Sequence, residues 1–362
     1  MIPERLQIGG TPAAMGRTHG SAYRDDIARF AAERVAAAGD ARWIGTDVSR
    51  ADVLALAEAC LPAHHDYAPA LFTELAALAE AAGLSTAEAL IVSGFTDFLD
   101  TAHAVFGAGA APASPTADQC TAMMVPPQRS ATGGPLFAQT WDMHESATAH
   151  VVMLDGRPDD APRFKLFTSR GCLGMIGMNE AGITVGINNL SGADGRHGVT
   201  WNFVVREVLA GTTFAAARRA LDRAPLAGAH NYLLMAPSGE GINVEATATT
   251  RVVTTLTDTP IVHTNHCMAE ATRRHERQRL AASQRSSSRR LARAQSLLAD
   301  SPSITIDTLA AITRDTNDIC YPPTPLYGMT TCGAVLADPT ARRLWALRGR
   351  PSEQRYHGFD VD

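Results

Sequence analysis

The sequence predicts an α+β fold, and three observations support this prediction. The first hundred residues are rich in alanine, leucine and glutamate and have a helical period. Beyond Cys120 the chain changes to short apolar runs separated by glycine-containing turns, which is typical of strands. Groups of helices and strands then alternate to the end of the chain, and such an order suits layers of helices packed on sheets.

Helices dominate the expected N-terminal region. Ser49 and Ser85 are expected N-caps, and Gly83 is an expected C-cap. The expected helices are Arg24–Ala38, Ser49–Leu61, Pro69–Ala82 and Ser85–Leu99. Phe106–Ala117 is rich in Gly, Pro and Ala without any period, which predicts a linker. We therefore divide the chain into residues 1–119, which are helical and end in this linker, and residues 120–362.

The second region is expected to mix strands and helices. Residues 179–182, Asn-Glu-Ala-Gly, predict a turn between two of the strands. The expected strands are Phe164–Thr168, Gly171–Gly177, Ile183–Asn188, Asn231–Pro237, Gly241–Ala246, Arg251–Leu256, Thr331–Asp338 and Arg343–Ala346. The expected helices are Thr200–Ala210, Thr213–Asp222, Ser286–Leu298 and Ile306–Arg314.

Composition and charge limit the classes of function. The net charge is −5 and the pI about 6.2, so no strong field recruits nucleic acid or an anionic membrane. The first residues lack a basic segment leading into an apolar run, and no stretch reaches the roughly 18 apolar residues of a membrane span, so a cytoplasmic location is the expectation. The six cysteines are scattered, which predicts free thiols: Cys60, Cys120, Cys172, Cys267, Cys320 and Cys332.

The stretch around Cys120 predicts a β-hairpin. Two strand-length runs, Cys120–Val125 and Leu136–Met143, flank a segment rich in proline and glycine. If the strands pair from the turn outward, the antiparallel register brings Cys120 opposite Trp141 and beside Asp142.

A cysteine at the start of a strand, after a linker, allows two interpretations. Cys120 is either a buried small hydrophobe, as most free cysteines are, or a nucleophile. If the bond before it is cut, its new α-amino group has an ordinary pKa of about 8 and can accept the thiol proton. One residue would then supply both nucleophile and base.

The motif around Cys120 resembles a known family. Gln-Cys-Thr followed by a hairpin that ends in Gln-Thr-Trp-Asp is similar to the autoproteolytic family of isopenicillin N acyltransferase (acyl-CoA:6-aminopenicillanic acid acyltransferase), which belongs to the N-terminal nucleophile (Ntn) hydrolases. Further similar blocks occur in the same order from Gly9 onward. They are residues 177–190, residues 231–245, His-Thr-Asn-His at 263–266, and Thr330–Pro351.

The resemblance implies a fold and a mechanism. The fold is a four-layer αββα sandwich preceded by a mainly helical N-terminal segment. Self-cleavage between Gln119 and Cys120 would separate a pro-segment, residues 1–119, from a catalytic core, residues 120–362. Cys120 would then form an acyl-enzyme with a small-molecule amide or acyl thioester.

The resemblance also assigns roles to other residues. Asn265 matches the family's Asn-His block and would stabilise the oxyanion. Asp142 matches the Trp-Asp position and would orient the new ammonium or hold the backbone from Thr140. Each has a structural alternative, as a turn-forming amide and as a carboxylate that caps the hairpin end. Residues placed near processing or substrate are Thr121, Thr140, Ser287 and Arg290.

The sequence departs from the family pattern at two points. Gln119 stands where glycine is common before the nucleophile, and a residue with restricted φ is expected to slow cleavage. The turn of the hairpin is also longer than in the penicillin enzyme, so the spacing from Cys120 to Asp142 differs.

Other functions are compatible with some of the residues. A zinc site could use His263, His266 and Cys267, with His275 nearby, although a structural zinc site usually needs a second pair of ligands. An unprocessed cysteine–histidine hydrolase could use His144, His263 or His266 as base to Cys120. A binding or scaffold protein without catalysis is the third alternative.

We therefore predict a self-processing hydrolase or acyltransferase with amide hydrolysis as the main reaction. Water is always present, and no phosphate cradle for coenzyme A is evident in the sequence. No cofactor and no metal are expected. The pieces 1–119 and 120–362 should stay associated, since the helices would otherwise expose their apolar faces.

Overall fold

Two β-sheets occupy the centre of the molecule. The computed structural model describes residues 1–107, 119–324 and 328–362, and within them one sheet has eight strands and the other six. The larger sheet has the order β1 (Glu4–Gly10), β4 (Val151–Pro158), β5 (Phe164–Ser169), β6 (Ile176–Asn179), β7 (Thr184–Asn189), β8 (His230–Met235), β9 (Gly241–Ala246) and β10 (Arg251–Thr255). The smaller has the order β11 (Ile261–His263), β2 (Gln119–Val125), β3 (Leu136–His144), β12 (Met329–Asp338), β13 (Arg343–Arg348) and β14 (His357–Asp360).

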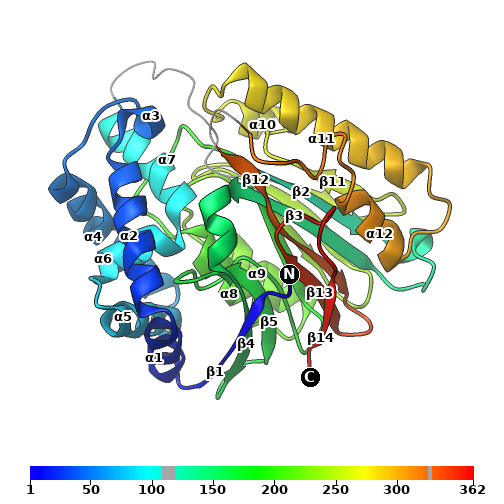
Figure 1. Ribbon diagram of the computed structural model, residues 1–362, viewed down its shortest axis with the longest axis horizontal. Coiled ribbons are helices and arrows are strands. Elements are labelled where there is room, and N and C mark those ends of the chain that lie inside the picture. Colours follow the sequence, from blue (N-terminus) through cyan, green and yellow to red (C-terminus); the bar gives the residue numbers. More distant parts are fainter. Residues whose placement is uncertain (108–118, 325–327) are drawn as a thin grey trace.

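Helices cover the outer face of each sheet. The sheets pack on each other, with β2 against β7 and β8. The larger sheet is covered by α8 (Trp201–Leu209) and α9 (Phe214–Arg223), and the smaller by α11 (Ala281–Ala299) and α12 (Ile306–Thr313). A short helix, α10 (Glu270–Arg273), and two 3₁₀ turns, η1 (Pro127–Arg129) and η2 (Glu145–His150), connect these elements. The order helix, sheet, sheet, helix confirms the predicted four-layer αββα sandwich (Figure 1).

The N-terminal segment is mainly helical, as predicted, and packs beside the sandwich (Figure 1). Its helices are α1 (Pro12–Ala22), α2 (Arg24–Ala38), α3 (Ala41–Ile44), α4 (Arg50–Tyr67), α5 (Pro69–Ala82), α6 (Thr86–Ser93) and α7 (Phe95–Phe106). Gly16 allows α1 to lie directly on α5, because a Cβ at this position would come within 2.1 Å of the Glu74 carbonyl oxygen.

Local signals in the sequence located the helix ends well. Ser49 and Ser85 are N-caps whose side chains accept from the amides of Asp52 and Glu88, and Ser85 completes a capping box. Gly83 ends α5 in the left-handed conformation with φ 76°. These predicted caps are confirmed.

Other expectations differ from the structure. The expected helix Ser85–Leu99 is broken at Gly94, where a Cβ would lie 2.4 Å from Thr200 Cβ, so close packing on the start of α8 needs glycine. The expected strand Gly171–Gly177 begins only at Ile176. Strand β1 was not expected, since it pairs in parallel with β4 at a distance of about 150 positions in the chain. Most of the predicted linker, residues 108–117, lies outside the described residues.

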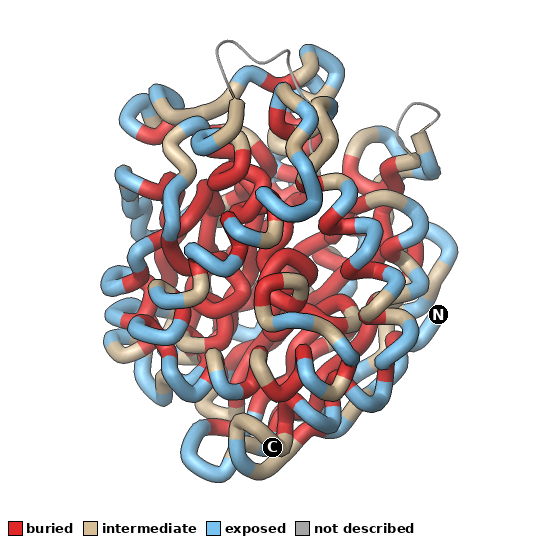
Figure 2. The backbone as a smooth tube through the Cα atoms, turned by 90° about the vertical axis from the view of Figure 1, so that its left-hand side faces the viewer, coloured by how far each residue is buried: buried red, intermediate tan, exposed pale blue. Residues whose placement is uncertain are grey.

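The hairpin that carries Cys120 crosses the interior of the molecule. Every residue of β2 is buried, and β3 is buried except at its last residue, His144. The inner strands of both sheets form the buried centre in Figure 2, and exposed residues lie on helix surfaces, on turns and on edge strands such as β1 and β10. The candidate site is therefore built on rigid, solvent-excluded strands.

None of the helices that the structure describes is long and apolar enough to cross a membrane by itself. Among the described helices, only α5 and α6 taken together have the length and apolar composition of a membrane span, and they are bent by 107° at the break between them.

Candidate active site

The hairpin of β2 and β3 positions the candidate nucleophile. Cys120 pairs with Trp141 and Gln119 with Asp142, which confirms the predicted register. Gln119 and Cys120 both belong to β2. The bond that would be cut therefore lies in an ordered, buried strand, immediately after the residues that the structure leaves undescribed.

Side chains alternate between the two faces of this hairpin. Cys120 belongs to the apolar core between the sheets, together with Trp141. Gln119 and Thr121 point toward α11, and Asp142, directly opposite Gln119, shares their face. The thiol and the carboxylate are thus neighbours along the backbone, but their side chains leave opposite faces of the sheet. The role of Asp142 in orienting the new ammonium or holding the backbone stays a prediction.

Asn265 lies beside the nucleophile because of strand register. Strand β11 pairs antiparallel with β2 and puts His263 opposite Ala122, so the chain two residues later is opposite Cys120. The amide of Cys120 donates to Asn265 Oδ1 at 2.7 Å, and Asn265 Nδ2 donates to the carbonyl of Asn189 at 3.1 Å. The side chain joins the two sheets at Cys120. Its oxygen, and not its nitrogen, contacts the Cys120 amide, so the role of oxyanion donor stays a prediction.

Arg290 is fully buried on α11 and touches the backbone at the candidate cleavage site. Its Nη1 donates to the carbonyl of Cys120 and to Thr121 Oγ1 at 3.1 Å. Its Nη2 donates to Asn265 Oδ1 at 3.0 Å and to Gln119 Oε1 at 3.3 Å. The predicted residues Arg290, Asn265, Thr121 and Cys120 therefore form one hydrogen-bonded group.

Ser287, one turn before Arg290 on α11, holds the loop that carries Asn265. Its Oγ accepts from the Asn265 amide at 2.9 Å, lies 2.8 Å from His266 Nδ1, and donates to Thr264 Oγ1 at 3.0 Å. Ser287 thus fixes the backbone at Asn265 and does not contact Cys120 directly.

The remaining predicted residue, Thr140, lies on the neighbouring strand. Thr140 Oγ1 accepts from the amide of Thr121 at 3.3 Å. This contact is a second tie between β2 and β3 one residue after the nucleophile, and it suits a supporting role.

Two residues of the site were missed by the sequence analysis. Tyr321 donates from its hydroxyl to Gln119 Oε1 at 2.8 Å, and Ser286 donates to the same oxygen at 3.2 Å. Ser286 was considered only as part of a helix start, and Tyr321 lies in the connection between α12 and β12. No local sequence pattern predicts these contacts, because both depend on how α11 and that connection pack on β2.

Glu245 organises the segment that follows β11. Its carboxylate lies 2.9 Å from His263 Nε2, and it accepts from Thr272 Oγ1 and from the Ala269 amide. Burial alone would raise the pKa of Glu245, but the hydrogen bonds from His263, Thr272 and Ala269 outweigh it and lower the pKa to about 2. Glu245 is therefore an ionised anchor for the loop that contains Asn265.

The histidines near this loop do not converge as metal ligands would. His263 has both ring nitrogens occupied, by Glu245 and by the Thr264 carbonyl. His275 lies 3.6 Å from Asp194 instead. Within the ranges that the structure describes, no group of three His, Cys, Asp or Glu side chains could hold a metal ion. The geometry does not favour the zinc alternative.

The low basicity of the histidine rings also argues against the cysteine–histidine hydrolase. Burial lowers the pKa of His144 and of His266 to about 4. Both rings are then neutral but weakly basic near pH 7, so they are poor acceptors for a thiol proton. His263, held between two acceptors, is fixed in place.

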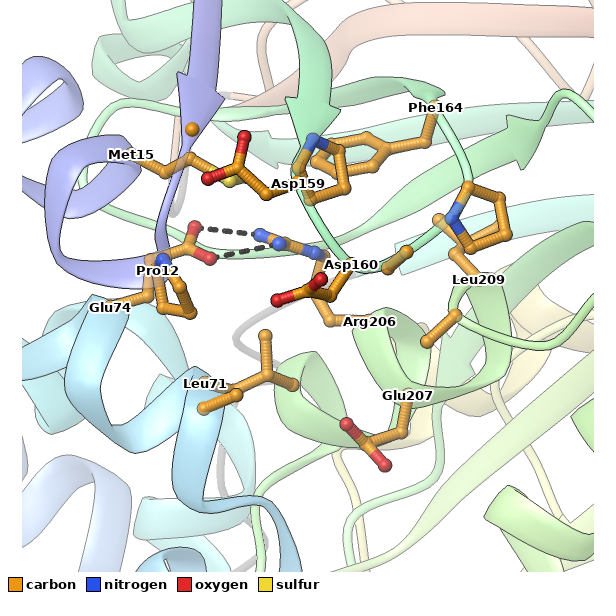
Figure 3. Close-up of a pocket in the computed structure, with 16 residues that line it drawn as sticks. Pro12, Met15, Leu71, Glu74, Asp159, Asp160, Phe164, Arg206, Glu207 and Leu209 are labelled. Carbon is orange, nitrogen blue, oxygen red and sulfur yellow. Dashed lines mark hydrogen bonds and ion pairs between the residues drawn. The ribbon is translucent and has the colours of Figure 1, made fainter.

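A separate cavity of about 260 Å³ lies away from Cys120 (Figure 3). It is bounded by α1, α5, α8 and the β4–β5 connection. Its floor is closed by Arg206 and Glu74, which form a two-armed ion pair at 2.8 and 2.9 Å. The other lining residues include the apolar side chains of Leu71, Phe164 and Leu209 and the carboxylates of Asp159, Asp160 and Glu207.

Comparison with known proteins bears directly on function. A family model, acyl-coenzyme A:6-aminopenicillanic acid acyl-transferase, matches residues 129–353. The 40 kDa form of acyl-coenzyme A:6-aminopenicillanic-acid-acyltransferase from Emericella nidulans is 24% identical over 265 residues, which are 72% of this chain and 68% of that protein. The matched family region contains Asp142, Asn265, Ser287 and Arg290, and it begins nine residues after Cys120.

Two solved structures resemble this chain in fold. A mutant form of conjugated bile acid hydrolase from Clostridium perfringens is 12% identical with a TM-score of 0.48, and the match covers 67% of this chain and 92% of that one. Penicillin V acylase from Agrobacterium tumefaciens is 13% identical with a TM-score of 0.40, and the match covers 63% of this chain and 83% of that one.

The sequence matches place the chain in the class of acyl-transferring enzymes. More narrowly, because the family model matches more than half of its residues, the chain belongs to the acyl-coenzyme A:6-aminopenicillanic acid acyl-transferase family. The predicted family is thereby confirmed.

Proposed function

We propose that this chain is an inactive precursor that cuts itself before Cys120 and then acts as a cysteine N-terminal nucleophile hydrolase or acyltransferase. Its substrate is a small-molecule amide or acyl thioester. No resident cofactor takes part in the proposed steps, which use the side chains around Cys120 and the new α-amino group.

The first reaction is an acyl shift within the chain. The sulfur of Cys120 attacks the carbonyl carbon of Gln119, the C–N bond breaks, and the thiol proton passes to the departing nitrogen. A thioester between Gln119 and the sulfur results. Water then opens it, which leaves a carboxylate on Gln119 and a free thiol and amine on Cys120.

The second reaction repeats this chemistry on a substrate. The new amine takes the thiol proton, the sulfur attacks the substrate carbonyl, and the leaving amine or thiol departs with a proton. Water or an amine then accepts the acyl group from Cys120. We propose hydrolysis as the main outcome and transfer where a suitable amine is bound.

The contact between Arg290 and the backbone at Gln119–Cys120 carries this proposal. A fully buried guanidinium that donates to the Cys120 carbonyl and to the Gln119 side chain holds both sides of the scissile bond. Its positive charge favours the negative charge that develops on sulfur and on the tetrahedral oxygen. Asn265, bound to the Cys120 amide at 2.7 Å, restrains the nitrogen that becomes the base.

Tertiary contacts support continued association of the two pieces. Strand β1 pairs with β4 across the whole of its length. Asp97 on α7 lies 2.8 Å from His230 Nδ1 on β8, and Asp100 accepts from the amides of Gly192 and Ala229. Such buried contacts between residues 1–119 and 120–362 persist when one peptide bond is cut. The cytoplasmic location remains a prediction.

An acyl-trapping experiment tests the catalytic part of the proposal. The purified protein is treated with p-nitrophenyl butyrate, and its mass is measured under denaturing conditions. We expect one butyryl group on the piece that begins at Cys120, removed by hydroxylamine as a thioester is. A butyryl group that also appears on Cys120→Ala, or none on the wild type, contradicts the proposed nucleophile.

A further inference from the structure

The side chain of Gln119 is held by a cluster of donors, and two of them, Tyr321 and Ser286, have no part in the proposed cleavage steps. Its Oε1 accepts from the Tyr321 hydroxyl at 2.8 Å, from Ser286 Oγ at 3.2 Å and from Arg290 Nη2 at 3.3 Å. Gln119 itself is buried, with 8% of its surface exposed. Three donors on one amide oxygen make a site for an acceptor oxygen, and we call this group the Gln119 subsite.

Arg290 supplies the positive charge at this subsite. Within the described residues, Arg290 donates only to neutral oxygens and takes part in no ion pair. A buried cation without a partner is costly, and an oxygen with full or partial negative charge relieves that cost. When Gln119 leaves after cleavage, the three donors lose their acceptor.

A cavity continues outward from this subsite. It has a volume of about 440 Å³ and is lined, among other described residues, by Gln119, Leu280, Ser286, Tyr321 and Met329. This volume falls within the range of small-molecule sites. A polar subsite at its inner end and apolar walls beyond suit a short ligand with one polar terminus.

The two reactions of the proposed function place two acyl groups on one sulfur. In self-cleavage the acyl group on Cys120 is the residue Gln119, and in turnover it is the acyl group of the substrate. Both thioesters are attached to the same sulfur atom. The carbon chain of the substrate acyl group therefore contacts the same protein surface as the side chain of Gln119. The uncut protein thus displays, in its own residue 119, the acyl group that self-cleavage transfers to the Cys120 sulfur.

We infer that the substrate of this enzyme carries a five-carbon acyl group with an acceptor oxygen at its far end. In Gln119 that oxygen is on the fifth carbon counted from the carbonyl. The matching substrates are amides of glutaric acid or of its monoamide, whose terminal carboxylate or carboxamide binds Tyr321, Ser286 and Arg290. Tyr321 and Ser286 determine specificity here, and this inference rests on the proposed function.

Two anilides that differ only in the acceptor test this inference. The p-nitroanilides of 4-carbamoylbutanoic acid and of 5-methylhexanoic acid have acyl groups of the same length and branching. We expect kcat/KM of the self-cleaved protein to be about tenfold or more higher for the carbamoyl compound, because an apolar end leaves buried donors unpaired. Tyr321→Phe and Ser286→Ala should each lower this ratio by about threefold or more, whereas Ser288→Ala, an exposed neighbour on α11, should leave it unchanged.

The possible outcomes separate this inference from the function it rests on. The mass of each protein is measured first, and an uncut, inactive wild type overturns the proposed function and this inference together. A cleaved protein that turns over both anilides equally, or neither of them, overturns the acyl preference alone. An unchanged ratio in both variants removes Tyr321 and Ser286 from the subsite. If Tyr321→Phe stays uncut, the ratio of kcat/KM for the two anilides in Ser286→Ala alone tests the subsite.

Discussion

Two buried arginines, Arg206 and Arg290, show how different the surroundings of the same side chain are in a structural contact and at the candidate active site. Arg206 on α8 is matched by Glu74 on α5, at 2.8 and 2.9 Å, and so ties the N-terminal helices to the sandwich. Arg290 on α11 has no carboxylate partner among the described residues and donates to neutral oxygens around Cys120.

The difference lies in where the charge is compensated. A buried ion pair cancels its own field, so removing one member leaves an uncompensated charge and destabilises the fold. A buried arginine that donates only to neutral acceptors keeps its field, and the fold must offset the desolvation cost elsewhere. Residues that retain an unbalanced charge next to a scissile bond are therefore candidates for function.

The largest effect is expected on stability at Glu74. Glu74→Gln leaves Arg206 buried without its partner and should lower the free energy of unfolding by about 3–5 kcal/mol. Urea unfolding of the purified variant measures it. The matched control is the double variant Glu74→Leu with Arg206→Met, which should recover most of the loss. Equal losses in the single and double variants would contradict the assigned role of the pair.

A large effect on rate is expected at Arg290. Arg290→Met should slow self-cleavage about 100-fold, since it removes the buried positive charge that lies beside the scissile bond and favours the developing negative charge. Its free energy of unfolding should change much less than that of Glu74→Gln. The time course of fragment appearance on denaturing gels measures the rate. Arg285→Met, on an exposed position of α11, is the control and should cleave at the wild-type rate. Cleavage of Arg290→Met at the wild-type rate would contradict the difference drawn between Arg290 and Arg206.

A smaller effect, on pH dependence, is expected at His19 near Arg206. Burial, with a further contribution from Arg206, lowers the pKa of His19 to about 3. The unfolded chain binds a proton at this residue as the pH falls through 6.5, whereas the folded chain does not until about pH 3. The stability that comes from keeping His19 neutral is therefore fully present above about pH 6.5. Below that pH, the free energy of unfolding decreases by up to about 1.4 kcal/mol per pH unit.

Unfolding experiments at pH 7 and pH 5 measure this dependence. His19→Gln should show a shallower loss than the wild type over that interval, because it cannot take up the extra proton when it unfolds. His65→Gln, at an exposed position of α4, should keep the wild-type slope. Equal slopes in all three proteins would show that His19 does not titrate as described.

The sequence predicted best what local chemistry determines. The register of Cys120 with Trp141 follows from a hairpin of two consecutive strands, and the caps at Ser49 and Gly83 follow from local hydrogen bonding and a left-handed turn. Strand β1 was missed because parallel pairing with β4 leaves no local signal. The break at Gly94 was missed because it arises from contact with Thr200.

The candidate site divides in the same way. Asn265 and Arg290 were found through the family resemblance, and register and helix packing then explain why they meet at Cys120. The direction of Asp142, away from the thiol, follows from the pleat once the register is known. Tyr321 and Ser286 could not be found, because their common partner, Gln119 Oε1, is reached only in the folded chain.

The mass of the wild-type protein under denaturing conditions tests the central claim most directly. Cleavage between Gln119 and Cys120 predicts two pieces of about 13 and about 26 kDa, by residue share of the 38.4 kDa chain, and Cys120→Ala should give only the full-length mass. An active wild-type protein with a single full-length mass would contradict self-processing and the use of the Cys120 amine as base.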